Sequence, residues 1–490
     1  MQASNTHKYL TLVFDQGSHA SRIALFSETG QLVYLKSADI STCSPESGHY
    51  EHDANEILNS LLQLLNSIPG RFIKQIINCS LCTQRSSVVA WHKQSGTPLS
   101  PVISWRDLRN VDFLNRIKTL PVNFQKITGL PLSGHYSASK IHWLLHNNAK
   151  VKQAANDQQL CVAPLSSFLT FHLLDNQPFI VDHSNAQRSL LFDIKKLIWS
   201  DELLDVFQIS RDFLPDCLPV ISHHGVLKNF NIPMTAVCGD QNAAVHAYPE
   251  MTNDKALINI GTGAFVLSKS DELNKPAKLL RSIISSNTQH ANYLTEGTVN
   301  GAGNAISWAT NMFSSIALYN NENKVFSLLP EWINTYMSPP VFINTVSGLG
   351  SPWWCNGGST EFINNTEASY AEKYVAIIES IVFLLFSNMQ QLKHPPKIIF
   401  ISGGLARIDG LCQKLADLAE AEIQRFQETE TSARGCAWLA NQLNTQEDKE
   451  HPPLWQSPKT EKHFSPENNP ELLRRYQQLV GELQKRCHSD

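Results

Sequence analysis

Two segments in which a glycine turn joins two apolar strands stand half a chain apart, and they constrain the fold more than any other feature. The first has strand-like residues at 9–14 and 22–26, and the second has them at 256–260 and 264–268. Short apolar runs bounded by small residues predict β-hairpins. Two related hairpins in one chain therefore predict two domains of one design.

Strands and helices alternate between and after these hairpins. Residues 54–68 and 370–392 have the apolar spacing of helices, whereas 76–81 and 397–402 read as strands. Alternation of this kind predicts an α/β architecture.

The chain length supports two large domains. Its 490 residues exceed the roughly 100–200 that one domain uses. We expect the boundary in the loop 248–253, which contains Pro249. The expected domains are residues 1–248 and 254–444, and residues 445–490 are expected to form a peripheral tail. That tail ends in a charged helix, 470–486.

Composition excludes several classes of function. Charged residues make up 17% of the chain and the formal net charge is −4, so we expect no nucleic-acid partner, which would need a basic face. The longest apolar run, residues 375–386, is shorter than the ~20 residues of a membrane span and predicts a buried core helix. Residues 1–8 are polar and show no signal peptide. We therefore expect a cytoplasmic protein without a membrane partner.

Ten cysteines are scattered along the chain. Only Cys79 and Cys82 form a C-x-x-C, and no second pair lies nearby, so a zinc or redox site is the weaker interpretation. Reduced thiols in a core are favoured, and they suit a cytosolic protein.

The first hairpin carries groups that can bind a metal and a phosphate. Asp15 ends the first strand, and Gly17 lets the backbone approach an anion and present its N–H groups. Ser18, His19 and Ser21 add donors. A hairpin with glycine is more often only a hairpin, so the phosphate site stays an alternative at this point.

The second hairpin has a similar glycine turn, Gly261-Thr262-Gly263. Two such turns in one chain favour phosphate binding more than one does, because phosphoryl transfer needs donors on several oxygens. The chain has no G-x-x-x-x-G-K-[ST], and no G-x-G-x-x-G follows its first strand. A P-loop enzyme and a dinucleotide-binding dehydrogenase are therefore poorly supported.

Asp240 lies between strand-like residues 235–237 and helix-like residues 243–247. Catalytic groups often lie at such strand-to-helix turns, but Asp is also a favoured helix N-cap, and this segment alone favours the cap. Gly403 and Gly404 follow a buried strand. They predict either a tight turn or bare backbone against which an adenine ring can lie.

Nine motifs follow one another in a characteristic order. They are FDQG with SR (14–22), GHYEHD (48–53), TQR (83–85), W-x-D-x-R (105–109), NAQRSLLFD (185–193), GDQ (239–241), GLGSPWW (348–354), GGLARIDGLCQKLADL (from 403) and residues 433–440. Together they resemble the FGGY carbohydrate kinase family, which includes glycerol kinase, xylulokinase and ribulokinase. Each motif is moderately specific, but their shared order and spacing is highly specific.

The resemblance implies an α/β fold of two actin- and hexokinase-like (ribonuclease H-like) domains around a central cleft. It also implies transfer of the γ-phosphoryl group of ATP to a hydroxyl of a small polyol or ketose, of the glycerol, pentitol, ribulose or xylulose class. The implied cofactors are ATP and Mg²⁺, and the implied partner is a small-molecule polyol or sugar. A homo-oligomer is left open.

By position, the resemblance assigns Asp240 as the general base and Asp15 as the residue that positions Mg²⁺. It assigns nucleotide contacts to Gly17, Ser18, His19, Arg22, Gly261, Thr262, Gly263, Gly403 and Gly404. It assigns acceptor contacts to Arg85, Ser86, Trp105, His135, Gln241 and Phe265.

Three departures from the family pattern bear on the substrate. His19 replaces a threonine of the phosphate loop, Ser86 replaces the glutamate of glycerol kinases, and His135 replaces a tyrosine. A tetritol, pentitol or ketopentose is therefore at least as well supported as glycerol. The alternative is a regulatory relative that binds ATP or sugar without turnover, and the retained Asp15 and Asp240 oppose it.

A third interpretation is a phosphatase or ATPase of the same superfamily. The acceptor-type residues Arg85, Trp105 and Asp107 argue against it.

Overall fold

The computed structural model describes residues 8–248, 250–269, 278–316, 321–365, 367–447 and 455–487. Within the predicted boundary loop and tail, Pro249 and residues 448–454 lie outside the described residues, as do residues 1–7. The chain forms two compact units: Met1–Glu250 with Arg281–Tyr293 and Glu430–Ser457, and Met251–Leu280 with Leu294–Thr429 and Pro458–Asp490. Each unit is made of three separate segments of the chain. The domain bounds expected from the sequence stay a prediction.

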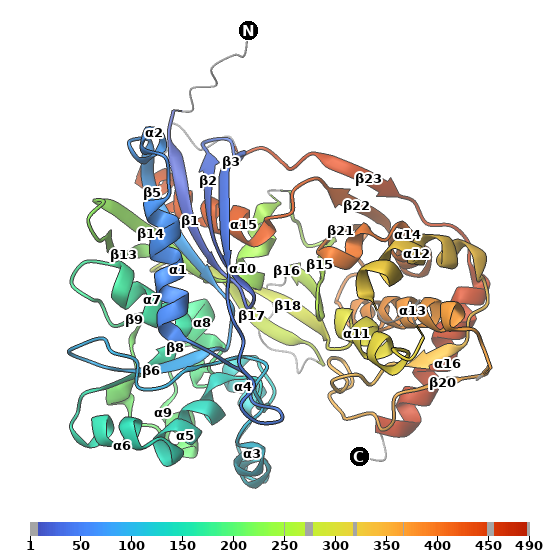
Figure 1. Cartoon of the computed structure of the whole chain (residues 1–490), viewed down its shortest axis with the longest axis horizontal. Helices are drawn as coiled ribbons and strands as arrows, with labels where there is room; N and C mark the ends of the chain where they lie inside the picture. Colours follow the sequence, from blue (N-terminus) through green and yellow to red (C-terminus); the bar gives the residue numbers. More distant parts are fainter. Residues whose placement is uncertain are drawn as a thin grey trace. The chain divides into compact units, whose positions relative to one another are not determined.

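The first unit is built on a six-stranded sheet in the order β13-β14-β5-β1-β2-β3. Its strands are β1 (Leu10–Gln16), β2 (Ala20–Ser27), β3 (Leu32–Asp39), β5 (Ile76–Thr83), β13 (Ile221–Leu227) and β14 (Ile232–Gly239). Helices α1 (Ala54–Asn66) and α7 (Leu165–Leu173) pack against it, as does α15 (Thr431–Glu447) (Figure 1). Strand β1 is buried along its whole length, as expected for a central strand covered on both faces.

A four-stranded sheet, β4-β7-β6-β8, and short helices complete this unit. The four strands of this sheet are β4 (Glu51–His52), β7 (Val102–Ile103), β6 (Val88–His92) and β8 (Leu160–Pro164). The remaining strands are β9 (Ile180–Asp182), β10 (Phe192–Asp193), β11 (Ile198–Trp199), β12 (Asp216–Leu218) and β17 (Leu280–Ser286). The helices are α2 (Gly70–Ile73), α3 (Val111–Ile117), α4 (Phe124–Thr128), α5 (Ser137–Asn147), α6 (Ala149–Asn156), α8 (His183–Gln187), α9 (Asp201–Phe207) and α10 (Asp240–Ala244).

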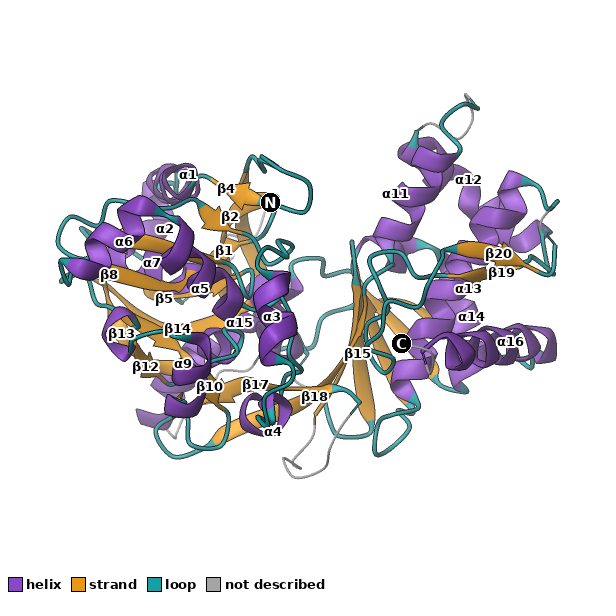
Figure 2. Cartoon of the chain, turned by 90° about the horizontal axis from the view of Figure 1, so that it is seen from below, coloured by secondary structure: helices purple, strands orange, loops and turns teal. Residues whose placement is uncertain are grey.

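The sheet of the second unit contains the order β18-β16-β15-β21-β22-β23. Its elements are β15 (Lys255–Ile260), β16 (Ala264–Lys269), β18 (Ala291–Val299), β19 (Val341–Ile343), β20 (Glu361–Ile363), β21 (Ile398–Ser402), β22 (Glu422–Phe426), β23 (Thr460–Phe464), α11 (Gly303–Met312), α12 (Glu322–Thr335), α13 (Tyr370–Met389), α14 (Asp409–Ala419) and α16 (Pro470–Cys487). Helices α13, α14 and α16 gather on one side of this sheet (Figure 2).

The two sheets share one topology. In the first, β1 pairs antiparallel with β2, β2 antiparallel with β3, and β5 joins β1 to β14 by parallel pairing. In the second, β15, β16, β18, β21 and β22 repeat this order and these directions. The prediction of two hairpins of one design is confirmed.

Helix α13 is the core of the second unit. A capping box fixes its start, because Ser369 and Glu372 exchange hydrogen bonds at the first turn. The side chains from Val375 to Leu385 are all buried, which confirms the predicted core helix. The other predicted helices and strands are found within a few residues of the expected ends.

One expectation about cysteine is wrong. Cys355 and Cys487 form a disulfide bond in the second unit, so these two are not reduced thiols. Cys79 and Cys82 are buried and form no disulfide bond, as expected. In the described part of the chain, no group of three or more His, Cys, Asp or Glu side chains could hold a metal ion.

Candidate active site

The turn between β1 and β2 places Asp15 beside Arg22. The Gly17 amide donates to the Ala20 carbonyl across 3.0 Å and closes the hairpin. Arg22 Nη1 lies 3.4 Å from Asp15 Oδ2, and the Cys82 thiol donates to Asp15 Oδ1 across 3.2 Å. Burial raises the pKa of Asp15, while the Arg22 guanidinium lowers it. The result is an acidic group at the base of a glycine turn.

Ser18 connects this turn to the end of β5. Its hydroxyl donates to Gln84 Oε1 across 3.3 Å and accepts from the Trp105 indole N–H across 2.8 Å. Gln84 also donates to the Gly17 carbonyl across 3.3 Å. This bond holds the half-buried indole ring of Trp105 beside the turn. The network joins predicted nucleotide and acceptor residues.

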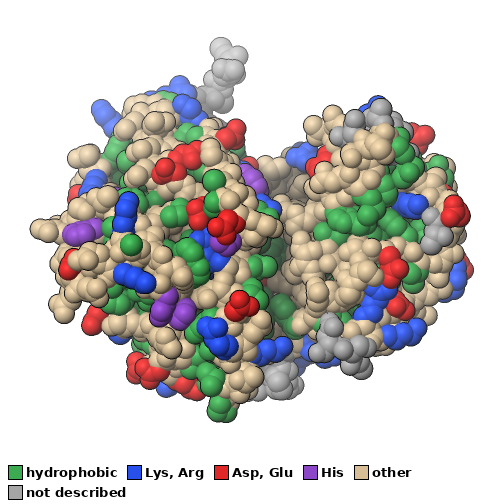
Figure 3. Space-filling model, turned by 60° about the horizontal axis from the view of Figure 1, so that its bottom comes forward, with side chains coloured by type: hydrophobic (Ala, Val, Ile, Leu, Met, Phe, Trp, Pro, Cys, Tyr) green, Lys and Arg blue, Asp and Glu red, His purple; other side chains and the backbone are tan. Residues whose placement is uncertain are grey.

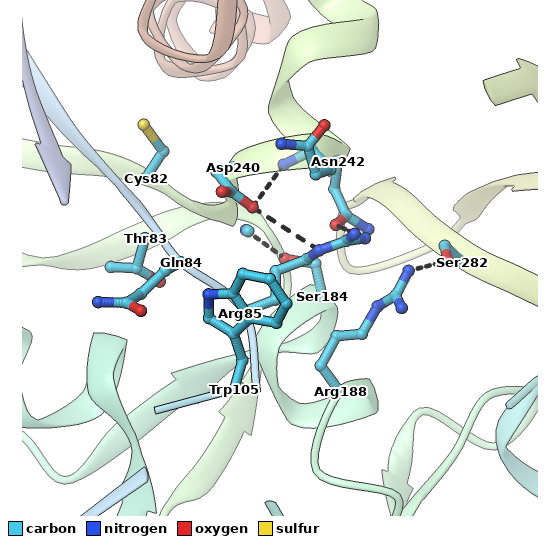
Figure 4. A network of polar contacts seen from close by, with 12 residues as sticks. Cys82, Thr83, Gln84, Arg85, Trp105, Ser184, Arg188, Asp240, Asn242 and Ser282 are labelled. Carbon is cyan, nitrogen blue, oxygen red and sulfur yellow. Dashed lines mark hydrogen bonds and ion pairs between the residues drawn. The ribbon is translucent and has the colours of Figure 1, made fainter. Parts of the chain in front are cut away.

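Asp240 and Arg85 meet where β14 runs into α10 (Figure 4). Arg85 Nε lies 3.7 Å from Asp240 Oδ1, and Arg85 Nη1 donates to Asn242 Oδ1 across 3.0 Å. A Cβ added at Gly239 would lie 2.7 Å from Arg85 Cγ, so any larger residue there would force Arg85 to move. A quarter of the Asp240 side chain is exposed, at 25%, and a ligand can reach it.

Asp240 is the first residue of α10, and the N-cap is Gly239. The N-cap interpretation of Asp240 is therefore wrong. Its Oδ1 accepts from the Gln241 amide across 2.7 Å. Burial raises the pKa of Asp240, while the Arg85 guanidinium lowers it. A carboxylate with a raised pKa is a better proton acceptor than an exposed one.

A buried network behind Gly239 was not found by sequence reasoning. Ser184 Oγ accepts from the Gly239 amide across 2.9 Å and donates to Asp182 Oδ2. Asp182 is 0% exposed and also accepts from Asn185 Nδ2 across 2.7 Å. This network fixes the backbone that carries Asp240. The only sequence signal was that Asn185 begins the NAQRSLLFD motif, directly after Ser184.

His135 lies in the loop before α5, and its ring centroid is 5.3 Å from that of Trp105. Ser86, after Arg85, is buried and has the left-handed φ of 63°. Its carbonyl accepts from Ser137 Oγ across 3.1 Å. Arg85, Ser86, Trp105 and His135 are thus tied to one region of the first unit.

The W-x-D-x-R motif also forms an ion pair within the first unit. Arg109 donates to Asp107 through Nε and Nη2, at 2.9 and 2.7 Å. Arg109 Nη2 also donates to Glu51 across 2.7 Å, and the Tyr50 amide donates to Asp107. These bonds lower the pKa of Asp107 against the effect of its burial. This pair fixes the loop that carries Trp105.

In the second unit, the hairpin turn Gly261-Thr262-Gly263 is anchored on α11. The Gly303 amide donates to the Gly261 carbonyl and the Asn304 amide to the Thr262 carbonyl, both across 3.0 Å. A Cβ on Gly303 would lie 2.8 Å from the Gly261 oxygen. Phe265 follows in β16 and pairs with Asn259 and Thr298.

A cavity of about 460 Å³ lies at the end of β21 in the second unit. It is lined by Ile401, Ser402, Gly403, Gly404, Ala406, Arg407, Arg425, Phe426, Gln427, Glu428, Thr429 and Glu461. Gly403 has φ of +94°, and a Cβ there would lie 2.5 Å from the Ile260 carbonyl. Gly404 has no heavy atom within 4 Å of its Cβ position. It therefore presents bare backbone to the cavity.

The two units share one sheet topology, each has a hairpin with a glycine turn, and the first has a carboxylate at a strand-to-helix turn. These are the features expected of a two-domain, actin-like kinase fold. Residues 10–245 match the N-terminal domain of the FGGY family of carbohydrate kinases, and residues 256–442 match its C-terminal domain. The chain belongs to this family. It is a sugar or polyol kinase that uses ATP.

Known relatives agree with this assignment. A glycerol kinase from Brevibacillus brevis is 28% identical over 89% of each chain. The structure of Plasmodium falciparum glycerol kinase with ADP has a TM-score of 0.82 at 22% identity, covering 98% of this chain and 97% of that one. A ligand-bound xylulose kinase from Lactobacillus acidophilus has a TM-score of 0.81 at 19% identity, covering 97% of each chain. These structures confirm the predicted fold.

Two further observations concern partners. Among the described residues, no helix has the length and apolar character needed to cross a bilayer. On the face drawn in Figure 3, basic and acidic side chains are interspersed.

Proposed function

We propose that this kinase transfers the γ-phosphoryl group of ATP to a hydroxyl of a polyol or ketose of the glycerol to pentose size, with Asp240 as general base. The pairing of Asp240 with Arg85 carries the proposal. It places a reachable carboxylate of raised pKa beside a guanidinium that can hold neighbouring hydroxyls.

Asp240 would accept the proton of the acceptor hydroxyl as its oxygen forms a bond to the γ-phosphorus. The bond from that phosphorus to the β,γ-bridging oxygen breaks, and ADP leaves. A loose transition state makes the proton transfer late, so a weak base is sufficient. The Arg85 guanidinium would hold the acceptor, while the rings of Trp105 and His135 would cover its C–H edge. Gln241 and Phe265 are the further proposed acceptor contacts.

The proposed nucleotide contacts come from the two hairpins and from the cavity of the second unit. The cavity at Gly403 and Gly404 has apolar walls at Ile401 and Phe426 and suits an adenine ring. Gly17, Ser18, His19, Arg22, Gly261, Thr262 and Gly263 are the proposed phosphate contacts. Mg²⁺ usually binds through one or two carboxylates and the phosphates themselves, and Asp15 supplies such a carboxylate. The ion would neutralise charge on the transferred group.

The test measures ADP release from Mg-ATP with three- to seven-carbon polyols and ketoses. One acceptor should stimulate release strongly in the wild type and not in Asp240→Asn. Acceptor-independent phosphate release at the same rate would instead indicate an ATPase. ATP binding without stimulation by any acceptor would refute the proposal in favour of a regulatory relative.

A second variant addresses the acceptor class. Ser86→Glu restores the acidic residue of glycerol kinases and should raise kcat/KM for glycerol relative to a pentitol. An unchanged ratio would show that Ser86 does not contribute to acceptor choice.

A further inference from the structure

Lys140 is a buried cation beneath the loop that carries His135. It lies near the start of α5 and is 0% exposed. Its Nζ donates to the His135 carbonyl across 2.6 Å and to the Tyr136 carbonyl across 3.4 Å. The ammonium group therefore binds the backbone of the loop, not its side chains.

This cation has no ion-pair partner of its own within the described part of the chain. Two charged groups act on its pKa in opposite directions, since Asp107 raises it and Arg109 lowers it. Asp107 is already bound by Arg109 across 2.7 Å. Lys140 also lies at the N-terminal end of a helix, where the helix dipole disfavours positive charge. Burial lowers the pKa of Lys140 to about 7.

A second buried lysine shows the more usual arrangement. Lys414 in α14 is 6% exposed, and its Nζ donates to Glu379 across 2.9 Å. Lys414 thus has a direct carboxylate partner, which it shares with Arg475 at 2.7 Å. An apolar side chain at the Lys140 position would avoid the cost of burying an amine that has no carboxylate partner, so stability alone does not explain Lys140.

The start of α5 also fixes a second turn. Ser137 Oγ donates to the carbonyl of Ser86, which follows Arg85 at the end of β5. One helix start thus holds the turn of Ser86 and, through Lys140, the loop of His135. These are two positions at which the chain departs from glycerol kinases.

We propose that Lys140 is a positioning residue for acceptor binding, whose ammonium holds the carbonyls of His135 and Tyr136 so that the His135 ring stays beside Trp105. This inference rests on the proposed function, because it needs the His135 loop to contact the acceptor. Lys140 itself does not touch the substrate. Its loss should free the loop and weaken acceptor binding while the nucleotide contacts of the second unit stay intact.

The experiment compares Lys140→Met with wild type and with Lys414→Met as a matched loss of a buried lysine. Amide hydrogen exchange is measured without substrate, and KM is measured for the acceptor and for ATP. In Lys140→Met, exchange at residues 133–137 should rise about tenfold while the β1, β5 and β14 amides keep wild-type rates. The acceptor KM should rise at least about tenfold, within the ~10²-fold that a misplaced contact can cost, and the ATP KM should stay within about twofold. Lys414→Met should change neither the loop nor the acceptor KM.

Wild-type exchange at the loop together with a wild-type acceptor KM would overturn the proposal. So would an equal effect in Lys414→Met, which would indicate general destabilisation. Should Lys140→Met not fold, Lys140→Arg is compared in the same way: the longer side chain must displace the His135 carbonyl, so the acceptor KM alone should rise, and no rise overturns the proposal. A wild type without acceptor-stimulated ADP release refutes the proposed function, but the exchange measurement still decides the role of Lys140 in holding the loop.

Discussion

Arg85 Nε lies 3.7 Å from Asp240 Oδ1, so the end of β5 and the start of α10 present one cation and one anion to the same point. The two side chains come from distant parts of the sequence. Parallel pairing of β5 with β14 brings Thr83 opposite Gly239 and thereby aligns the residues that follow each strand. The sheet register is therefore what assembles this site.

The first prediction concerns Asp240 as the base. Asp240→Asn removes the proton acceptor and keeps the shape of the side chain, so kcat should fall by about 10²–10⁴-fold. ATP affinity, measured by calorimetry, should stay within a few fold because the adenosine cavity is unchanged. Wild-type kcat on the best acceptor would show that the base lies elsewhere.

A second prediction concerns the pH dependence of turnover. Burial raises the pKa of Asp240 and Arg85 lowers it, and only the ionised carboxylate can accept a proton. Activity should therefore fall as pH drops through this pKa, which lies above the usual value of about 3.9 for Asp. Arg85→Met removes the lowering charge, so the acid limb of the kcat profile should move to higher pH.

Arg211→Met is the control for this loss of a guanidinium. Arg211 pairs with Asp216 at an exposed site, 3.0 Å away, and its removal should leave the profile unchanged. An acid limb at the same pH in Arg85→Met and wild type would show that protonation of Asp240 does not cause the loss of activity at low pH.

Gly239 supports a third prediction. In Gly239→Ala the new methyl group would lie 2.7 Å from Arg85 Cγ and 2.9 Å from its Cδ, so Arg85 must move. The acceptor KM should rise at least about tenfold, since misplacement of a binding group by an ångström can cost up to about 10²-fold. Steady-state kinetics with the best acceptor checks this.

Gly481→Ala in α16 is the matched control, because no heavy atom lies within 4 Å of its Cβ position. Alanine favours a helix by about 0.8–1 kcal/mol over glycine, so thermal stability should rise and kinetics should not change. Equal acceptor KM values for both variants would contradict the proposed role of Arg85.

The sequence predicts those parts of this site that depend on a local pattern of residues. A strand that ends in a carboxylate or glycine can be recognised from its own residues, which is why the positions of Asp15, Asp240 and Gly403 were predictable. Lys140 was not, because a lysine in a helix is ordinarily exposed and its burial depends on what packs against α5. Ser184 was missed for the same reason, since its bond to Gly239 joins two distant segments. The pairing of Cys355 with Cys487, 132 residues apart, has no local signal.

The fourth prediction concerns stability at Lys140. Its pKa is about 7 in the folded protein and near 10.4 in an unfolded chain. Between these values the unfolded state binds more protons, so the stability of the wild type should rise with pH from about 7 to 10. Asp107 and Arg109, the charged groups that face Lys140, do not titrate in this window, because the pKa of Asp107 is lowered and that of Arg109 is raised.

Lys140→Met lacks this titration. The thermal midpoint of the wild type should therefore rise relative to that of the variant between pH 7 and pH 9. Parallel pH profiles for the two proteins would show that Lys140 keeps its charge throughout.

The last prediction concerns the disulfide of the second unit. The bond joins Cys487, at the end of α16, to the loop at Cys355 and closes a long loop of chain. Cross-links of this kind stabilise by about 2–4 kcal/mol, chiefly by restricting the unfolded chain. Arg486 donates to the Ser359 carbonyl across 2.8 Å and holds the same helix end to the same segment, so reduction should not release α16 completely. A reductant should lower the thermal midpoint of the wild type by several degrees and leave that of Cys487→Ser unchanged. Equal midpoints for the oxidised wild type and Cys487→Ser would mean that the bond adds nothing to the hold already provided by Arg486.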